Sequence, residues 1–178
     1  MSVNEIKEFD IDMKTSHDSE VLADGQQVIT ACALIHKTEN GVPRVFMPRR
    51  AKTKKFLPDV FELPGGHIDF GEGLVDGLAR EINEEFGMKV KIGSPFAAFT
   101  YVNDVKKSHS AEVIYFATFV DSEDDITLDP SDHSEYIWVS LDEISKAYTE
   151  AKGADDEEFV YLRIGLELLN GGLLNYGV

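Results

Sequence analysis

The sequence predicts an α/β layer architecture built around one core. Segments rich in apolar and β-favouring residues lie on both sides of an amphipathic helical pattern at residues 73–86, and two further helical patterns close the chain. A mixture of this kind packs helices against a sheet. At 178 residues the chain is long enough for one domain with a substantial core, and short for two.

The N-terminal part predicts an arm followed by a hairpin. Residues 1–25 are polar, mixed in charge and without clear periodicity, so we expect an arm that precedes a domain of residues 26–178. Residues 28–36 are apolar and β-favouring, and an extended pattern resumes at residues 44–47 after a turn signal at residues 39–41. This order indicates a β-hairpin.

A Pro- and Gly-rich segment then leads to the central helix. Residues 57–66 contain Leu-Pro and Leu-Pro-Gly-Gly, which leave regular structure and let the backbone approach a ligand. Over residues 73–86 the apolar side chains recur at helical spacing, and Gly87 supplies a C-terminal stop. The members of this stripe are Leu74, Val75, Leu78, Ile82 and Phe86.

The remainder of the chain predicts strands and then helices. Strand patterns occupy residues 89–92, 96–102, 111–120 and 136–139, and helical patterns occupy residues 141–151 and 156–169.

The composition indicates a globular protein that folds in water. Hydrophobic residues make up 43% of the chain and aromatic residues 10%. No apolar run approaches the roughly 18 residues that span a bilayer, so we expect no membrane partner. The first residues lack the basic and apolar regions of a secretory signal, and we therefore expect a cytoplasmic location. Cys32 lies in an apolar stretch and is expected to be a small buried hydrophobe.

The charge of the chain constrains its partners. A formal net charge of −16 repels nucleic acids and polyphosphates unless cations intervene, so we expect no stable nucleic-acid complex. One local basic cluster precedes the central helix. It consists of Arg44, Arg49, Arg50, Lys52, Lys54 and Lys55.

The central helix carries the candidate chemistry. Glu81, Glu84 and Glu85 stand at i, i+3 and i+4, which brings three carboxylates together, and Glu85 projects between Leu74 and Leu78 at the apolar stripe. Runs of Glu usually coat a solvated helix face, and that is the competing interpretation. Carboxylates at the border of a core repel one another, whereas Mg²⁺ takes oxygen ligands and removes that repulsion.

A longer motif surrounds these glutamates. Residues 66–88, GHIDFGEGLVDGLAREINEEFGM, fit G-x5-E-x7-R-E-U-x-E-E-x-G-U at every position, where U is a bulky aliphatic residue. The fixed positions are Gly66, Glu72, Arg80, Glu81, Ile82, Glu84, Glu85, Gly87 and Met88. The segment resembles the Nudix box. The resemblance implies the Nudix fold, an α/β/α sandwich with a mixed β-sheet, and the expected order of elements agrees in outline over residues 28–169.

The resemblance also implies roles for the box residues. Glu81 and Glu85 are expected to be the principal metal ligands, with the Gly65 carbonyl as a backbone ligand. Glu84 is expected to be a further ligand or the base that activates water, and Arg80 to orient a box carboxylate. Two or three Mg²⁺ or Mn²⁺ ions are implied.

Other residues are expected to complete the site. Arg49 and Arg50 resemble the end of the hairpin strand that reaches the phosphates in similar enzymes. Many Nudix enzymes draw another acidic residue from beyond the box. Glu112, Asp132 and Glu135 compete for that role, and we favour Glu135 because it precedes Trp138 in a similar context. Phe70, Phe99 and Tyr101 are aromatic candidates for stacking on a base.

The implied function is hydrolysis of a nucleoside diphosphate linked to a further group X. A nucleoside triphosphate, ordinary or oxidised, is the first expectation for this small-molecule substrate. ADP-ribose, sugar nucleotides and dinucleoside polyphosphates stay open, as do the phosphorus that is attacked and a homodimer. A Nudix-like module that senses nucleotides without cleaving them is the alternative. The isopentenyl diphosphate isomerase branch is disfavoured because Cys32 is a poor candidate for its catalytic cysteine.

Overall fold

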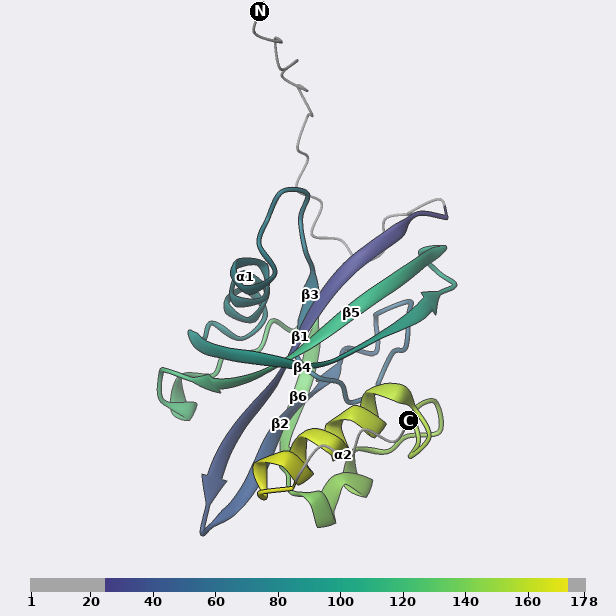
Figure 1. Cartoon of the computed structure of the whole chain (residues 1–178). Helices are drawn as coiled ribbons and strands as arrows, with labels where there is room; N and C mark the ends of the chain where they lie inside the picture. Colours follow the sequence, from purple (N-terminus) through teal and green to yellow (C-terminus); the bar gives the residue numbers. More distant parts are fainter. Residues whose placement is uncertain (1–24, 173–178) are drawn as a thin grey trace, which may run out of the picture.

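A six-stranded mixed β-sheet organises the computed structural model, which describes residues 25–172 (Figure 1). Its strands are β1 (Gln27–Glu39), β2 (Val42–Arg50), β3 (Gly65–His67), β4 (Val90–Asn103), β5 (Ser108–Phe119) and β6 (His133–Val139). The order is β4-β5-β1-β2-β6, with β3 also paired to β1. β1 and β5 run parallel, and the other pairs are antiparallel. The predicted arm lies outside the described residues apart from Gly25.

Side chains of the central strand β1 are buried on both faces of the sheet. Cys32 and Leu34 belong to one apolar cluster, whereas Ala31, Ala33 and Ile35 belong to a second cluster on the other face. The side chains of a strand alternate between faces, and a strand covered on both sides therefore reads as a continuous apolar run. This explains the uninterrupted apolar stretch around Cys32, which is buried as predicted.

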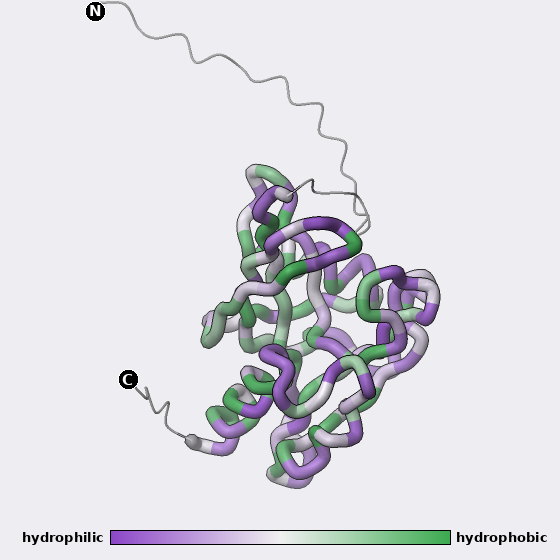
Figure 2. Tube along the Cα trace, turned by 90° about the vertical axis from the view of Figure 1, so that its right-hand side faces the viewer, coloured by the Kyte–Doolittle hydropathy of each residue, from purple (hydrophilic) through white to green (hydrophobic). Residues whose placement is uncertain are grey.

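Two helices cover the two faces of the sheet (Figure 1). α1 (Leu74–Phe86) buries Leu78, Ile82 and Phe86 in one cluster, and Gly87 caps it in the left-handed region at φ 66°. α2 (Glu157–Leu169) packs on the opposite face. Hydrophobic and hydrophilic residues alternate along α2, as expected for a helix with one covered side (Figure 2). The predicted α/β/α sandwich is confirmed, and no helix among residues 25–172 is long and apolar enough to cross a membrane.

The structure corrects several predicted elements. The strands expected at residues 89–92 and 96–102 form one strand, β4, because residues 93–95 stay extended and only shift its register against β5. The helix expected at residues 141–151 is a shorter 3₁₀ helix, η2 (Leu141–Ala147). The short strand β3 and the 3₁₀ helix η1 (Glu123–Asp125) were not predicted. Both are too short to leave a periodic pattern.

Candidate active site

A cavity of about 610 Å³ opens beside β3 and the C-terminal half of α1. Its walls come from six parts of the chain: β1 with β3, the end of β2 with the segment that follows it, α1, the pair β4 and β5, the segment before β6, and the residues at the start of α2. The size is typical of a site for a small molecule. Segments far apart in sequence therefore meet around one hollow.

Arg80 gathers the carboxylates of the helix at the edge of this cavity. Its Nε and Nη2 atoms donate to Glu72 at 3.0 and 2.9 Å, and Nη1 donates to Glu81 Oε1 at 2.8 Å and to Glu84 Oε2 at 3.2 Å. A further bond reaches the carbonyl of His67 at 3.1 Å. Hydrogen bonds to Glu72 and Glu81 raise the pKa of the Arg80 guanidinium, so it stays charged. Arg80 thereby ties the loop before α1 to the α1 carboxylates.

Glu85 carries a buried carboxylate oxygen at the edge of the cavity. Its Oε2 atom is buried and has no hydrogen-bond partner among the described residues. Burial raises the pKa of Glu85 well above its ordinary value, and the negative charges of Glu62, Glu81 and Asp132 raise it further. A buried carboxylate without a partner is costly, and a cation removes that cost.

The backbone of β3 lies directly against Glu81 and β1 at two glycines. A Cβ atom on Gly66 would lie 2.5 Å from Glu81 Oε2, and one on Gly65 would lie 2.2 Å from the carbonyl oxygen of Ala31. Gly65 also adopts φ 148°, which favours glycine. The two glycines of the box loop therefore let a strand lie directly against the α1 carboxylates, with Gly65 in the cavity wall.

These residues fit a divalent cation in their chemistry. Mg²⁺ and Mn²⁺ prefer oxygen ligands, and Glu81, Glu84, Glu85 and Gly65 all line the cavity. The partnerless Oε2 of Glu85 is the atom that most needs a cation. Within residues 25–172, however, no three Asp, Glu, His or Cys side chains already converge as a metal ion requires. Arg80 binds one carboxylate oxygen of Glu81 and one of Glu84, and these two oxygens therefore point toward Arg80 and not toward a shared metal position.

Arg50 reaches the cavity from the end of β2. Its Nη1 donates to both oxygens of Glu62 at 2.9 and 3.1 Å, and the buried His133 ring contacts the same carboxylate at 3.2 Å. Burial alone would raise the pKa of Glu62, but the Arg50 charge and the His133 contact outweigh it and lower the pKa to about 2. Glu62 therefore stays ionised and holds Arg50 in the cavity wall.

Arg49 and Glu135 lie outside the residues that line the cavity. Arg49 donates to Glu135 at 2.8 Å, and this ion pair joins β2 to β6. The Nε atom of Arg49 also lies 3.0 Å from the Asp59 carboxylate. Within the basic cluster that the sequence singles out, Arg50 and Lys54 line the cavity, and Lys54 pairs with Asp132. Arg44 instead binds Glu39 and Glu143.

The other two candidates for the acidic residue beyond the box line the cavity at different places. Asp132 lies near the box, where its negative charge raises the pKa of Glu85. Glu112 lies on β5, where it accepts hydrogen bonds from Thr30 at 3.2 Å and Cys32 at 3.1 Å. The three candidates therefore occupy separate positions.

The cavity contains two of the three predicted aromatic residues and several residues that the sequence did not predict. Phe99 and Tyr101 line the cavity as the aromatic candidates require, whereas Phe70 is 81% exposed outside it. Glu62, Lys152 and Glu158 also line the cavity and were not singled out. Lys152 is the clearest signal in retrospect, because it is the one basic residue in an acidic stretch over residues 150–158.

Comparison with known proteins identifies a family and several relatives of this chain. The NUDIX domain model matches residues 26–161. A Danio rerio protein named m7GpppN-mRNA hydrolase NUDT17 is 26% identical over 153 residues, which cover 78% of this chain and 49% of that protein. An 8-oxo-dGTP diphosphatase of Buchnera aphidicola is 42% identical over 41 residues, covering 23% of this chain and 32% of that protein. The chain thus spans about half the length, or less, of these curated relatives.

Solved structures share the same fold. The MutT protein from Methanosarcina mazei Go1 superposes with a TM-score of 0.65 at 24% identity, covering 83% of this chain and 97% of that one. A C. elegans Ap4A hydrolase binary complex gives a TM-score of 0.62 at 20% identity, covering 81% and 98%. At these identities the likeness concerns the fold.

Proposed function

The chain belongs to the Nudix family, and from that premise we propose that it is a metal-dependent pyrophosphohydrolase acting on a nucleoside diphosphate linked to a group X. One observation carries the proposal. Arg80 holds Glu72, Glu81 and Glu84 together beside the partnerless Oε2 atom of Glu85. A surface helix with a solvated acidic face would not bury a carboxylate oxygen without a partner.

Glu81, Glu85 and the Gly65 carbonyl would hold the ions, and Glu84 would be a further ligand or the base. When bound, two or three Mg²⁺ or Mn²⁺ ions would screen the phosphate charges and acidify the attacking water. Glu84 is the most exposed of the three, with 45% of its side chain accessible against 13% for Glu81. This exposure supports Glu84 as the residue that accepts the proton of the attacking water.

Arg50 and Lys54 would bind the phosphates. Their carboxylate partners, Glu62 and Asp132, keep both cations beside the box until the substrate arrives. Arg49 is a weaker candidate because Glu135 and Asp59 already bind it outside the cavity lining. For the acidic residue beyond the box we favour Asp132 over Glu135, since Asp132 lines the cavity and lies close enough to Glu85 to raise its pKa.

A nucleoside triphosphate, ordinary or oxidised, is the substrate we favour. Two relatives are named for guanine nucleotides, the m7GpppN-mRNA hydrolase and the 8-oxo-dGTP diphosphatase, and this supports a guanine nucleotide. Capped RNA, dinucleoside polyphosphates, ADP-ribose and sugar nucleotides are the alternative groups X.

The proposal is tested with a panel of these substrates. The purified chain is incubated with each compound and Mg²⁺ or Mn²⁺, and the products are identified by chromatography and mass spectrometry. We expect cleavage of a phosphoric anhydride bond in one class, with guanine nucleoside triphosphates first. Nucleotide binding without any product across the panel would instead identify a non-catalytic sensor.

A further inference from the structure

The part of the cavity on the α2 face of the sheet differs chemically from the part beside the box. We call it the inner pocket; its residues are Cys32, Phe99, Tyr101, Glu112, Lys152 and Glu158. It is formed on the α2 face of β1, β4 and β5, which places it away from the α1 carboxylates. Phe99 and Tyr101 are candidates for stacking on a base, and the proposed hydrolysis assigns the other four residues no task.

Glu112 lies in the wall of the inner pocket, and both of its carboxylate oxygens can accept further hydrogen bonds. In the sheet register it lies between Thr30 on β1 and Phe99 on β4. Thr30 Oγ1 donates to its Oε2 atom and Cys32 Sγ donates to its Oε1 atom, so each carboxylate oxygen accepts one bond. An ionised carboxylate has about four acceptor positions, and both oxygens can therefore accept again.

Lys152 and Glu158 neutralise each other at the wall of the inner pocket. Lys152 is 4% exposed and its Nζ lies 2.7 Å from Glu158 Oε2, while the backbone N–H of Leu63 donates to Glu158 Oε1 at 2.6 Å. Asp156 also faces Lys152 at 3.7 Å. Lys152, the one basic residue of the inner pocket, is therefore already paired, and the net charge of the inner pocket is negative. Phosphate groups are repelled here and belong at the Arg50 end of the cavity.

Aromatic rings give the inner pocket flat walls. Tyr101 is stacked with Phe56 at an interplanar angle of 14° and a centroid separation of 6.2 Å, and Phe99 is stacked with Tyr161 at 24° and 5.6 Å. Rings held in this way favour a planar ligand. The ligand must also bring hydrogen-bond donors, because ionised carboxylates only accept.

We infer that the inner pocket is a nucleobase site selective for guanine, in which Glu112 accepts hydrogen bonds from two adjacent N–H groups on the edge of the base. Guanine presents such a pair at N1 and the 2-amino group. Adenine lacks it, and hypoxanthine lacks the 2-amino group. A site that pairs with a donor rejects an analogue without it, because the buried acceptor is then left unpaired. The inference rests on the proposed function in one respect, namely that the phosphates lie at the box.

The test measures binding, so that it does not depend on turnover. Dissociation constants of GDP, IDP and ADP are determined by calorimetry with the wild-type chain and with Glu112→Gln. We expect the wild type to bind GDP at least about tenfold more tightly than IDP or ADP, the usual strength of a bidentate contact. Glu112→Gln should bring the three constants within about twofold of one another, because an amide offers one acceptor and places a donor against the base.

Controls separate the inference from a folding defect and from the proposed function. The comparison of GDP with IDP in the wild type needs no variant, so a folding defect cannot affect it. The variant Glu167→Gln, on the outer part of α2, should keep the wild-type ratios of the dissociation constants. Equal wild-type affinities, a preference for ADP, or a guanine preference that survives in folded Glu112→Gln would overturn the inference. A guanine preference without hydrolysis of any substrate would uphold the pocket and reject the proposed activity.

Discussion

At the scale of single residues, the box was predictable and its neighbours were not. Arg80, Glu81 and Glu85 stand in a fixed local pattern, so their shared location follows from helix geometry. Arg50 meets Glu62, and Glu62 meets His133, only after the chain folds, because 12 and 71 residues separate the members of these pairs. Glu135 illustrates the same limit, since its neighbour in the fold is Arg49 and no nearby residue in the sequence indicates this.

The inner pocket gives a residue-scale prediction on pH. Burial and the charge of Glu158 raise the pKa of Glu112 to about 7, against the opposing effects of Cys32, Lys152 and Thr30. Below that pH Glu112 is protonated and loses acceptor capacity; above it the carboxylate is ionised. The preference for GDP over IDP should therefore increase between about pH 6 and about pH 8. The ratio of dissociation constants measures this directly, and a ratio that stays flat or falls would refute it.

At the scale of elements, α1 was predictable because its apolar stripe has helical period. α1 spans Leu74–Phe86 and ends at Gly87, as the stripe and the glycine indicate. The strand β3 was not predictable, since three residues pair with β1 only through tertiary contact. η2 was not predictable either. The sequence suggests an α-helix, but the 3₁₀ helix ends at Ala147 and the residues after it place Lys152 in the cavity wall.

The packing of α2 on β1 gives a prediction at this scale. A Cβ atom on Gly165 would lie 2.2 Å from Leu34 Cδ1 and 3.0 Å from Phe96, and Leu34 is fully buried, so any shift of its side chain disturbs the packed core around it. Gly165→Ala should lower the free energy of unfolding by about 1–3 kcal/mol despite the better helix propensity of alanine. Urea denaturation checks this.

Gly153→Ala is the matched control, because nothing lies within 4 Å of a Cβ atom at that position. It should change stability by less than about 0.5 kcal/mol. If Gly165→Ala were as stable as this control, the close contact between α2 and β1 would be wrong.

At the scale of the whole molecule, charge and architecture support the same function. The chain carries a net charge of −16, yet Arg50 and Lys54 lie in the cavity beside a helix whose carboxylates need cations. The α/β/α sandwich brings α1, β3 and the end of β2 to one side of the cavity and the inner pocket to the other. A substrate with a phosphate chain and a base would span both.

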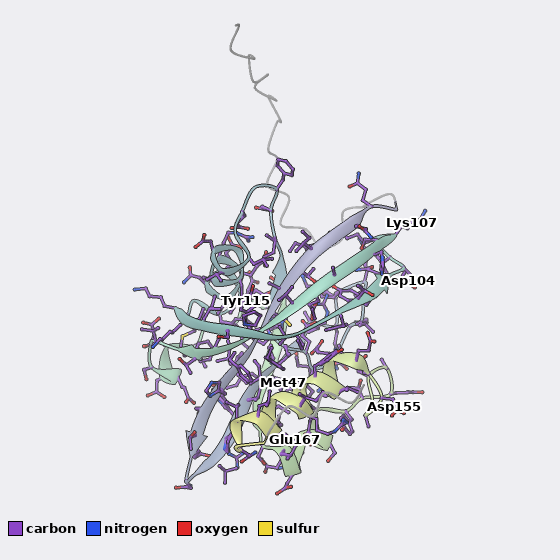
Figure 3. The ribbon with its side chains drawn as sticks, in the orientation of Figure 1. Met47, Asp104, Lys107, Tyr115, Asp155 and Glu167 are labelled. Carbon is purple, nitrogen blue, oxygen red and sulfur yellow. The ribbon has the colours of Figure 1, made fainter. Side chains whose placement is uncertain are left out.

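The most direct test of this account is the rate of nucleotide hydrolysis with Mg²⁺ or Mn²⁺ and with EDTA, for the wild type, Glu85→Gln and Glu167→Gln. Glu167 lies on α2 at the end away from Asp155, outside the cavity (Figure 3). We expect turnover that EDTA abolishes and added metal restores, a loss of at least about a hundredfold in Glu85→Gln, and none in Glu167→Gln. Turnover that resists EDTA, or a folded Glu85→Gln variant with wild-type activity, would contradict the assignment of the α1 carboxylates as the metal site.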